Sequence, residues 1–443
     1  MNWKTLLSPD RFGQESRVAK NENEIRTEFQ RDYDRIIFSS PFRRLQNKTQ
    51  VFPLPGSVFV HNRLTHSLEV ASVGRSLGNL VFDKVCPQLS TVEKPLVREI
   101  GTLVATACLA HDLGNPPFGH SGEKAISHFF KQGKGKEIQE IITSAEYADL
   151  ISFEGNANLI RLLTHQFKGR RPGGYALTLA SLGTMIKYPY DSSLHQLKKK
   201  FGYFQSEKDA FESIMSRLNI PLIDSSQGIY ARHPLVYLME AADDICYQVM
   251  DLEDAHKLKI ISGERIHQLF LGFFSGSKEP TTLKKIQTTL TEVTDSNEQI
   301  AFLRAMVIGR LVNATATVFV EKYPLIMKGS YQSKLLEDIE PELKQAMDIC
   351  ATTAYEEVYK HPSVVKIEIS GYNVLGFLLD EFYNAVVSPD SDYAHKMLSL
   401  MPVQYHPQSD SFYDKARCVV DFVSAMTDVY AVELYKQIKG LEL

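Results

Sequence analysis

The sequence has few cysteines, no signal core and no long apolar run, and each absence narrows the class of protein. Its five cysteines lie far apart without a CxxC pair: Cys86, Cys108, Cys246, Cys350 and Cys418. Such spacing fits neither a disulfide framework nor a cysteine zinc site, and it favours a reducing compartment. The longest apolar-leaning stretch, residues 103–110, is far short of a membrane span. We therefore expect a soluble, cytoplasmic protein without a membrane partner.

The sequence also lacks an excess of basic residues over acidic ones. The 443 residues include 49 Lys and Arg against 53 Asp and Glu, which gives a formal net charge of −4. This balance excludes a strongly basic nucleic-acid coat protein, although it leaves room for a basic pocket. Apolar residues at 44% and charged residues at 23% are ordinary for globular chains, so wholesale disorder is excluded as well.

What the chain does have is helical periodicity, which predicts a mainly α, or all-α, protein. Apolar residues recur at helical spacing after His66, and a largely apolar helix over 95–112 should end before Gly114 and the prolines that follow. We expect further helices at 235–255, 298–322, 333–360, 371–387 and 413–438. The best β-type run is 364–370, and the best loop candidates are 166–175 and 274–281.

Four ionisable side chains stand on these apolar helices, where burying a charge is costly unless it is paired or binds a metal. They are His66, His111, Asp112 and Asp243. Each alone has a plainer interpretation: a hydrogen-bonded core histidine, a chance His-Asp dipeptide, or an ion-paired aspartate. Two imidazoles and two carboxylates together, in this order, favour a divalent-cation site. A mixed set of this kind suits Mn²⁺ or Mg²⁺ more than structural zinc.

A second group lies in the loop HDLGNPPFGHSGE. His120 follows His111 across a Gly/Pro turn, and Glu123 comes one helical turn later. If a helix begins near Ser121, the two side chains lie close together at its N-terminus. A histidine oriented by a carboxylate suits proton transfer near neutral pH. The alternative is a capping loop whose glycines and prolines merely turn the chain.

A third group shares one face of the 235–255 helix. Asp243, Tyr247 and Asp251 are spaced i, i+4, i+8, so they stack along one side. If Asp243 binds a metal, the aromatic ring and the second carboxylate line the same pocket, where they suit a sugar face and its hydroxyl. Otherwise they are a core tyrosine and a surface acid.

These residues and their surroundings resemble the HD-domain metal phosphohydrolases, and more specifically the bacterial deoxyguanosinetriphosphate triphosphohydrolases and their dGTPase-like relatives. The similar strings run from about residue 26 to 428 and include HNRLTHSLEVA, LAHDLGNPPFGHSGE, FEGNANLIRLL, KKFGYFQSE, YLMEAADDICYQVMDLEDA and RCVVDFVSAMTD. The strings HDLGNPPFGHSGE and EAADDICY are far more specific than a His-Asp pair alone.

The resemblance implies an HD-domain helical fold with a helical C-terminal extension. The core would cover 1–265, and the region 266–443 would complete the site and form oligomer contacts. The implied reaction is metal-dependent hydrolysis of dGTP, or of deoxynucleoside triphosphates (dNTPs) in general, to deoxynucleoside and inorganic triphosphate. The implied partners are other copies of the chain, with hexamers among the assemblies, and dNTP or single-stranded DNA effectors.

The resemblance also implies roles for individual residues. It makes metal ligands of His66, His111, Asp112 and Asp243, and a catalytic pair of His120 and Glu123. Tyr247 would pack on the deoxyribose where a 2′-hydroxyl would clash, and Asp251 would accept from the 3′-hydroxyl. Further positions around the sugar, phosphates and nucleotide are Gln50, Arg63, Asn156, Lys187, Tyr188 and Lys200.

Two other functions remain open from the sequence. One is another HD-domain nucleotide phosphohydrolase, a nucleotidase or phosphodiesterase. The other is a nucleotide sensor that binds without hydrolysis, although the complete ligand set and the His120–Glu123 pair argue against loss of turnover.

Overall fold

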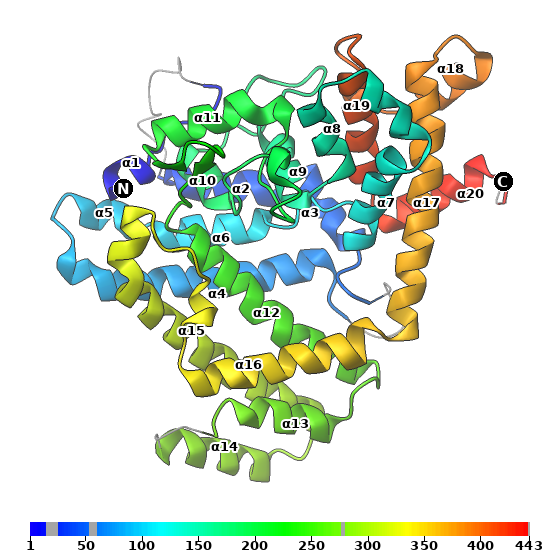
Figure 1. The fold of residues 1–443 in the computed structure, drawn as a ribbon. Helices are drawn as coiled ribbons and strands as arrows, with labels where there is room; N and C mark the ends of the chain where they lie inside the picture. The colour runs from blue at the N-terminus through cyan, green and yellow to red at the C-terminus, as the bar shows by residue number, and fades with distance from the viewer. Residues whose placement is uncertain (15–24, 53–59, 276–279, 442–443) are drawn as a thin grey trace.

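The computed structural model describes residues 1–14, 25–52, 60–275 and 280–441, and this part of the chain is built almost wholly from helices (Figure 1). The first eleven are α1 (Trp3–Leu6), α2 (Glu28–Ile37), α3 (Ser40–Arg44), α4 (Arg63–Val85), α5 (Glu93–Val97), α6 (Ile100–Ala110), α7 (His120–Lys131), α8 (Ser144–Ile151), α9 (Gly155–Thr164), α10 (Leu179–Met185) and α11 (Lys208–Arg217). The rest are α12 (Val236–Lys257), α13 (Gly263–Gly272), α14 (Pro280–Glu292), α15 (Ser296–Lys328), α16 (Pro341–Thr353), α17 (Pro362–Val387), α18 (Asp392–Ser399), α19 (Phe412–Ser424) and α20 (Asp428–Ile438).

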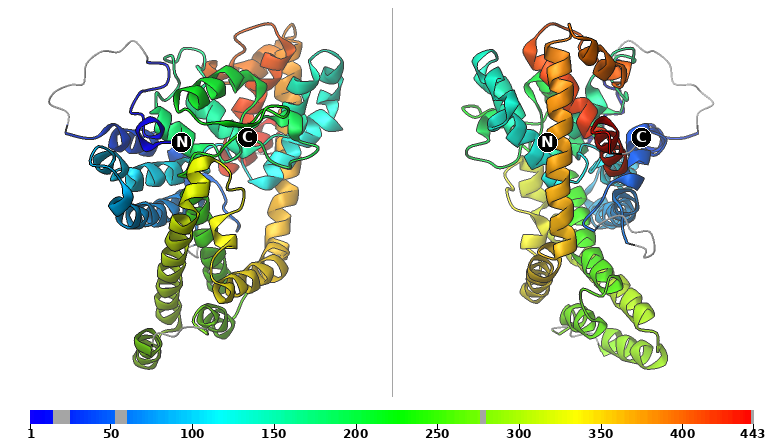
Figure 2. Two further views of the ribbon diagram at one scale, coloured as in Figure 1. Left: turned by 60° about the vertical axis from the view of Figure 1, so that its left-hand side comes forward. Right: turned by 90° about the vertical axis from the view of Figure 1, so that its right-hand side faces the viewer.

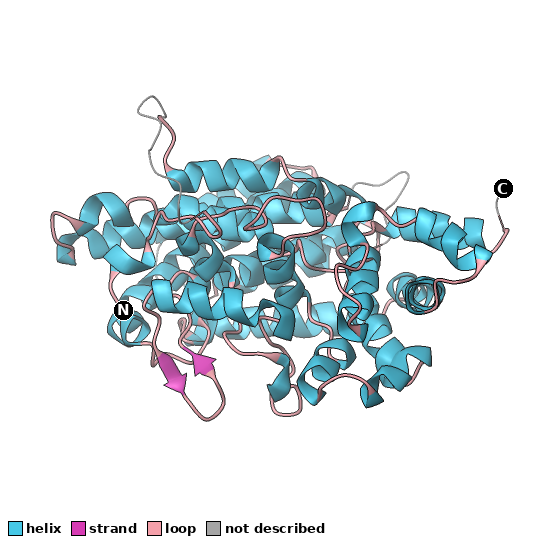
Figure 3. Cartoon of the chain, turned by 90° about the horizontal axis from the view of Figure 1, so that it is seen from above, coloured by secondary structure: helices cyan, strands magenta, loops and turns pink. Residues whose placement is uncertain are grey.

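Sheet structure in the described part is confined to one antiparallel hairpin at the edge of the molecule, β1 (Leu222–Asp224) and β2 (Ile229–Tyr230) (Figure 3). Short 3₁₀ segments and one π-helical turn complete the regular structure: η1 (Leu45–Asn47), η2 (Cys86–Gln88), η3 (Lys134–Glu140), η4 (Ser192–Leu194), η5 (Gln205–Glu207), η6 (Leu335–Glu337), η7 (Ala354–Tyr359, the π turn) and η8 (Val403–Tyr405). The all-α prediction is confirmed.

The expected β-type run at 364–370 is wrong, because these residues lie inside α17. His361 caps this helix by accepting from the Ser363 amide, and Pro362 occupies its first turn, where its fixed φ suits a helix. Burial of Val364 and, further along, of Val374 and Leu378 then outweighs the β preference of the run.

The 166–175 loop is confirmed. Of 274–281, residues 276–279 lie outside the described residues.

Some predicted helices are real but divided. The segment 95–112 separates into α5 and α6, the segment 333–360 is interrupted between η6, α16 and η7, and 413–438 forms α19 and α20. Figure 2 shows two long helices, α15 and α17, with α16 lying between them at one end of the molecule. Helix α12 crosses the middle of the molecule (Figure 1) and packs on α4, α6 and α15.

Helices α4 and α6 approach each other very closely because small residues face each other between them. A Cβ atom on Gly78 would lie 2.6 Å from the Gly101 Cα, and one on Gly74 would lie 2.5 Å from the Cys108 Sγ. The start of α4 thereby lies beside the end of α6, where the His66 and His111 rings are 5.4 Å apart. This contact sets the position of two of the four expected ligands.

Two hydrophobic clusters form the interior. The larger one contains the apolar faces of α4, α6, α12 and α15, and the smaller joins α7 and α8 to α17 and α19. The second cluster therefore combines residues from both halves of the sequence. The division into 1–265 and 266–443 stays a prediction.

One helix is more apolar than the sequence analysis expected. Within the described residues, α15 has an 18-residue window of mean hydropathy 1.4, long and apolar enough to cross a membrane. The expectation that residues 103–110 are the longest apolar stretch is thus wrong, because the α15 run is longer and keeps this mean hydropathy although Arg304 and Arg310 lie within the helix. A buried core helix meets the same criterion, and α15 packs on α4, α12 and α13. The cytoplasmic location stays a prediction.

The close contact between α4 and α6 predicts that one methyl group added at this contact lowers the stability of the fold. Gly78→Ala should lower the free energy of unfolding by about 1–3 kcal/mol, because the added atom overlaps the backbone of α6. The control is Gly309→Ala in α15, where nothing lies within 4 Å, and it should raise stability by about 0.5–1 kcal/mol. Urea denaturation of both variants measures the difference. Equal stability of Gly78→Ala and the unmodified protein would contradict the packing described here.

Candidate active site

Four side chains from three helices meet at the centre of the molecule. His66 lies in the first turn of α4, His111 and Asp112 follow the last residue of α6, and Asp243 lies in α12. Asp243 Oδ1 is 3.3 Å from His66 Nε2 and 3.4 Å from His111 Nε2. Asp112 Oδ1 lies 3.6 Å from His111 Nε2. The four residues expected to bind a metal are therefore brought together.

Local structure fixes the two imidazoles. Asn62 caps α4 by accepting from the Thr65 amide, which places His66 one turn inside the helix. The Nδ1–H of His111 donates to the carbonyl of Cys108 at 2.6 Å. A hydrogen bond of this kind leaves Nε2 with its lone pair free and orients the ring, as is typical of metal-binding histidines.

The chemistry of the group fits a divalent cation. Nε2 of His111 is buried and has no hydrogen-bond partner. One ligand atom each from His66, His111 and Asp112 lie within 4.8 Å of one another. Neighbouring ligands of an octahedral ion with bonds near 2.1 Å lie about 3 Å apart, close to the separations from Asp243. These residues could therefore hold Mn²⁺, Mg²⁺ or a similar ion with coordination positions to spare.

Two cations flank the carboxylates. Arg63 Nη1 donates to Asp112 Oδ2 at 2.8 Å, and Lys187 Nζ donates to Asp243 Oδ2 at 2.9 Å. Burial alone would raise the pKa of Asp112, but Arg63 and the two histidines outweigh it and hold that pKa below its usual value. For Asp243, Lys187 and His111 likewise outweigh burial and lower the pKa. Both carboxylates are thus ionised and able to act as ligands.

The second expected pair is also formed. His120 Nδ1 is 2.7 Å from Glu123 Oε2, and Glu123 Oε1 accepts from the Gly155 amide at 2.8 Å. The His120 side chain is 73% exposed, whereas the Glu123 side chain is 13% exposed. The imidazole ring therefore faces solvent, and the carboxylate that orients it is largely buried. Burial raises the pKa of Glu123, but the hydrogen bond and charge of His120 outweigh it, and the net pKa lies below its usual value.

A strained turn carries this pair. Phe118 has φ of 60° and Gly119 has φ of 57°, so two successive residues adopt positive φ immediately before α7. Such a conformation is uncommon for a residue other than glycine and costs on the order of 1 kcal/mol. At Gly119 a Cβ would lie 2.6 Å from Nη2 of Arg63. Arg63 therefore lies between the metal-binding group and the His120 loop.

Tyr247 and Asp251 lie on the same side of α12, as expected, and a third residue joins them. Tyr359, in the π turn η7, donates to Asp251 Oδ2 at 2.6 Å and stacks on Tyr247 with ring centroids 5.8 Å apart. Burial raises the pKa of Asp251 to about 7. Sequence reasoning missed Tyr359 because it is 108 residues from Asp251 in the chain, and nothing in its local sequence distinguishes it from other helical tyrosines.

The structure also describes the remaining expected residues. Gln50 Oε1 is buried without a hydrogen-bond partner. Asn156 Nδ2 donates to Glu154 Oε1 at 2.5 Å, and Lys200 Nζ lies 3.8 Å from the same oxygen. Glu154 is a buried acid that sequence reasoning missed. Burial and the neighbouring charge of Glu123 raise its pKa. Tyr188 is half-buried beside Lys187, and no direct hydrogen bond links it to the metal-binding group.

Comparison with known proteins agrees with this arrangement. The HD domain model matches residues 63–218, and the model of the phosphohydrolase-associated domain matches residues 338–437. These matches and the site define an enzyme of the HD-domain class, a hydrolase. Asp243 lies between the two matched segments.

Full-length relatives refine the class. A deoxyguanosinetriphosphate triphosphohydrolase-like protein of Synechocystis sp. is 38% identical over 100% of both chains, and one of Pseudomonas aeruginosa is 38% identical over 99% of both. A deoxyguanosinetriphosphate triphosphohydrolase of Yersinia enterocolitica is 31% identical over 100% of this chain and 99% of its own. The chain belongs to the deoxyguanosinetriphosphate triphosphohydrolase-like family.

The geometry predicts that substitution of two adjacent aspartates, Asp243 and Asp244, has very different effects on metal binding. Asp243→Asn should weaken Mn²⁺ binding by more than about 100-fold, because the carboxylate near both imidazoles is lost. Asp244→Asn is the matched control, since its carboxylate instead pairs with Lys334 at 2.9 Å. Both variants are stripped with chelator, reloaded with Mn²⁺, and their metal content is measured by mass spectrometry. Equal metal content in the two variants would exclude Asp243 as a ligand.

Proposed function

We propose that this protein hydrolyses deoxynucleoside triphosphates, dGTP or dNTPs in general, to deoxynucleoside and inorganic triphosphate. The observation that carries the proposal is the buried, unpartnered His111 Nε2, which converges with His66 and Asp243. Two cations pair with the carboxylates of this group, and one of them, Arg63, also reaches the loop that carries His120 and Glu123. The names of the relatives support the substrate class.

The cations of the site suit a triphosphate. Arg63 and Lys187 each pair with a carboxylate of the metal-binding group, and Lys200 lies at the edge with its side chain 41% exposed. We propose that these three side chains, with Asn156 and Tyr188, bind the phosphates. A bound divalent cation, Mn²⁺ or Mg²⁺, supplies further charge stabilisation for a phosphoryl oxygen. Ligands from His66, His111, Asp112 and Asp243 would hold it.

His120 is the proposed proton-transfer group. Its Nδ1 faces Glu123, so its Nε2 is the atom directed away from that carboxylate and able to reach a reacting oxygen. Glu123 is itself held by the Gly155 amide at the N-terminus of α9, which keeps the imidazole in one orientation. Water attacks the α-phosphorus and the bond to the 5′-oxygen breaks; a proton of the water ends on the 5′-oxygen, so deoxynucleoside and inorganic triphosphate are released.

The sugar would lie against α12. We propose that the Tyr247 ring excludes a 2′-hydroxyl and that Asp251 binds the 3′-hydroxyl. Tyr359 supports both, because it stacks on the first and donates to the second. The unpartnered amide oxygen of Gln50 is a further sugar contact in this proposal. Assembly with other copies, including hexamers, and dNTP or single-stranded DNA effectors belong to the same proposal.

One assay tests the activity. Each dNTP, singly and in pairs, is incubated with the protein and Mn²⁺, and the phosphate products are separated. Release of intact triphosphate with deoxynucleoside is expected, with little turnover of ribonucleotides. Pyrophosphate or orthophosphate without triphosphate would favour another HD-domain phosphohydrolase. Binding without turnover in every combination would favour a nucleotide sensor.

A variant separates catalysis from binding. His120→Ala should lower kcat by about 10²–10⁴-fold, because one proton-transfer group is lost, while metal content and dNTP affinity stay unchanged. His128→Ala on the same helix is the control, since that ring packs on Tyr372 at 5.2 Å. Steady-state kinetics and metal analysis measure both. A wild-type kcat in His120→Ala would remove His120 from the mechanism.

A further inference from the structure

The first turn of α20 reaches the site from the far end of the chain. The carboxylate of Asp428 is buried, with the residue 6% exposed. Its Oδ2 accepts from the Thr49 amide at 2.9 Å, and its Oδ1 accepts from the Phe118 amide at 3.0 Å. One side chain thus joins two backbone segments that are distant in sequence.

Each of these segments leads directly to a site residue. Thr49 precedes Gln50, whose amide oxygen is unpartnered, and Phe118 is followed by Gly119 and His120. Phe118 is also the residue with the uncommon positive φ. Its ring packs against α17 so closely that a Cβ on Gly371 would lie 2.5 Å from the Phe118 Cγ. The hydrogen bond from the Phe118 amide to Asp428 therefore stabilises the turn that determines the position of His120.

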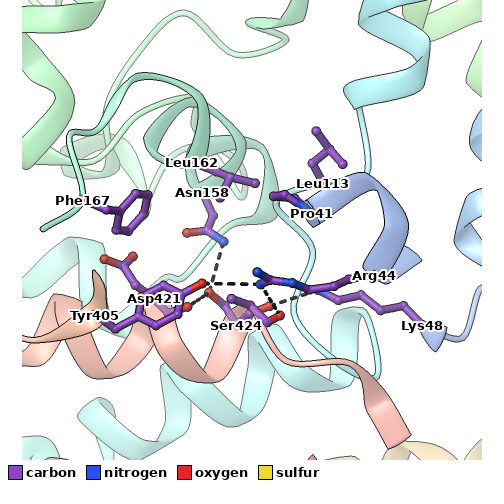
Figure 4. Close-up of a pocket in the computed structure, with 11 residues that line it drawn as sticks. Pro41, Arg44, Lys48, Leu113, Asn158, Leu162, Phe167, Tyr405, Asp421 and Ser424 are labelled. Atoms are coloured by element: carbon purple, nitrogen blue, oxygen red, sulfur yellow. Dashed lines mark hydrogen bonds between the residues drawn. The ribbon is translucent and has the colours of Figure 1, made fainter. Parts of the chain in front are cut away.

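Helix α19, which directly precedes α20, is held by several polar contacts. Lys48 Nζ donates to the carbonyl of Ser424 at 3.0 Å and to that of Asn115 at 2.6 Å, and Arg44 Nη1 donates to the carbonyl of Ala425 at 2.9 Å. Figure 4 shows Lys48 and Arg44 directed toward Ser424 at the end of α19. Helix α19 is in turn held to α9 by Arg161, whose Nη2 is 2.6 Å from Asp421 Oδ2.

We propose that Asp428 is a positioning residue for the reaction, which sets the segment carrying Gln50 and the loop carrying His120 relative to each other. The proposal rests on the proposed function, but Asp428 itself makes no contact with the metal-binding group. Both of its oxygens accept from backbone N–H groups, and both acceptors are needed. An asparagine at this position has one acceptor oxygen, so its NH₂ group would face one of the two amide donors.

The kinetic test compares Asp428→Asn with a matched control. Asp414, in the first turn of α19, also accepts from two backbone amides, those of Gln408 and Ser409, each at 2.9 Å, but on an exposed loop. Asp428→Asn should lower kcat by about 10–100-fold and raise KM several-fold, with Mn²⁺ content unchanged. Asp414→Asn should leave kcat and KM unchanged. Wild-type kcat and KM in folded Asp428→Asn would overturn the proposal.

A second measurement does not depend on activity. In the unmodified protein, hydrogen exchange should show protected amides at Thr49 and Phe118 although both lie outside long helices. Asp428→Asn should exchange faster at these two amides, and Asp414→Asn should not. Rapid exchange of both amides in the unmodified protein would overturn the proposal even if Asp428→Asn fails to fold. Protection in a protein that hydrolyses no dNTP would refute the proposed function and leave the positioning contact standing.

Discussion

The site depends on the close contact between α4 and α6. Glycines on both helices allow their backbones to approach until a single Cβ would overlap, as at Gly78. The contact places the first turn of α4 beside the last turn of α6, and α12 packs across both. Helices α4 and α12 and the end of α6 can then present His66, Asp243 and His111 to a common point more precisely than loops would.

The second constraint on the site is that its buried positive and negative side chains must balance each other. The whole chain is mildly acidic, at −4, yet the site gathers Arg63, Lys187 and Lys200. The first two are paired with the carboxylates that would bind the cation, which offsets the cost of burying either sign alone. The cation and the triphosphate of the proposed function would therefore meet side chains whose charges are already arranged in opposite pairs. Net charge therefore describes the exterior of this protein and not its site.

Much of the fold and of the candidate site could be predicted where the residues concerned lie close together in the sequence. The apolar helix ending in His111–Asp112 and the spacing of His120 and Glu123 predicted groups that the structure does bring together. The run 364–370 misled, because the packing of α17 as a whole outweighs its β preference: Val364 is buried, whereas Val365 and Ile369 are exposed. Tyr359 and Asp428 were missed since each contacts a segment distant in sequence. Glu154 has a local partner in Asn156, but its approach to Lys200 and Glu123 is evident only in the folded chain. The metal-binding and catalytic roles stay predictions.

In the proposed function, His66, His111, Asp112 and Asp243 hold one divalent cation where α4, α6 and α12 meet. Anomalous diffraction at the manganese edge, from crystals of the Mn²⁺-loaded protein, tests it most directly. A single strong peak is expected about 2.0–2.3 Å from both Nε2 atoms and from one oxygen of each aspartate. A peak elsewhere, or none at this position in fully loaded protein, would contradict it.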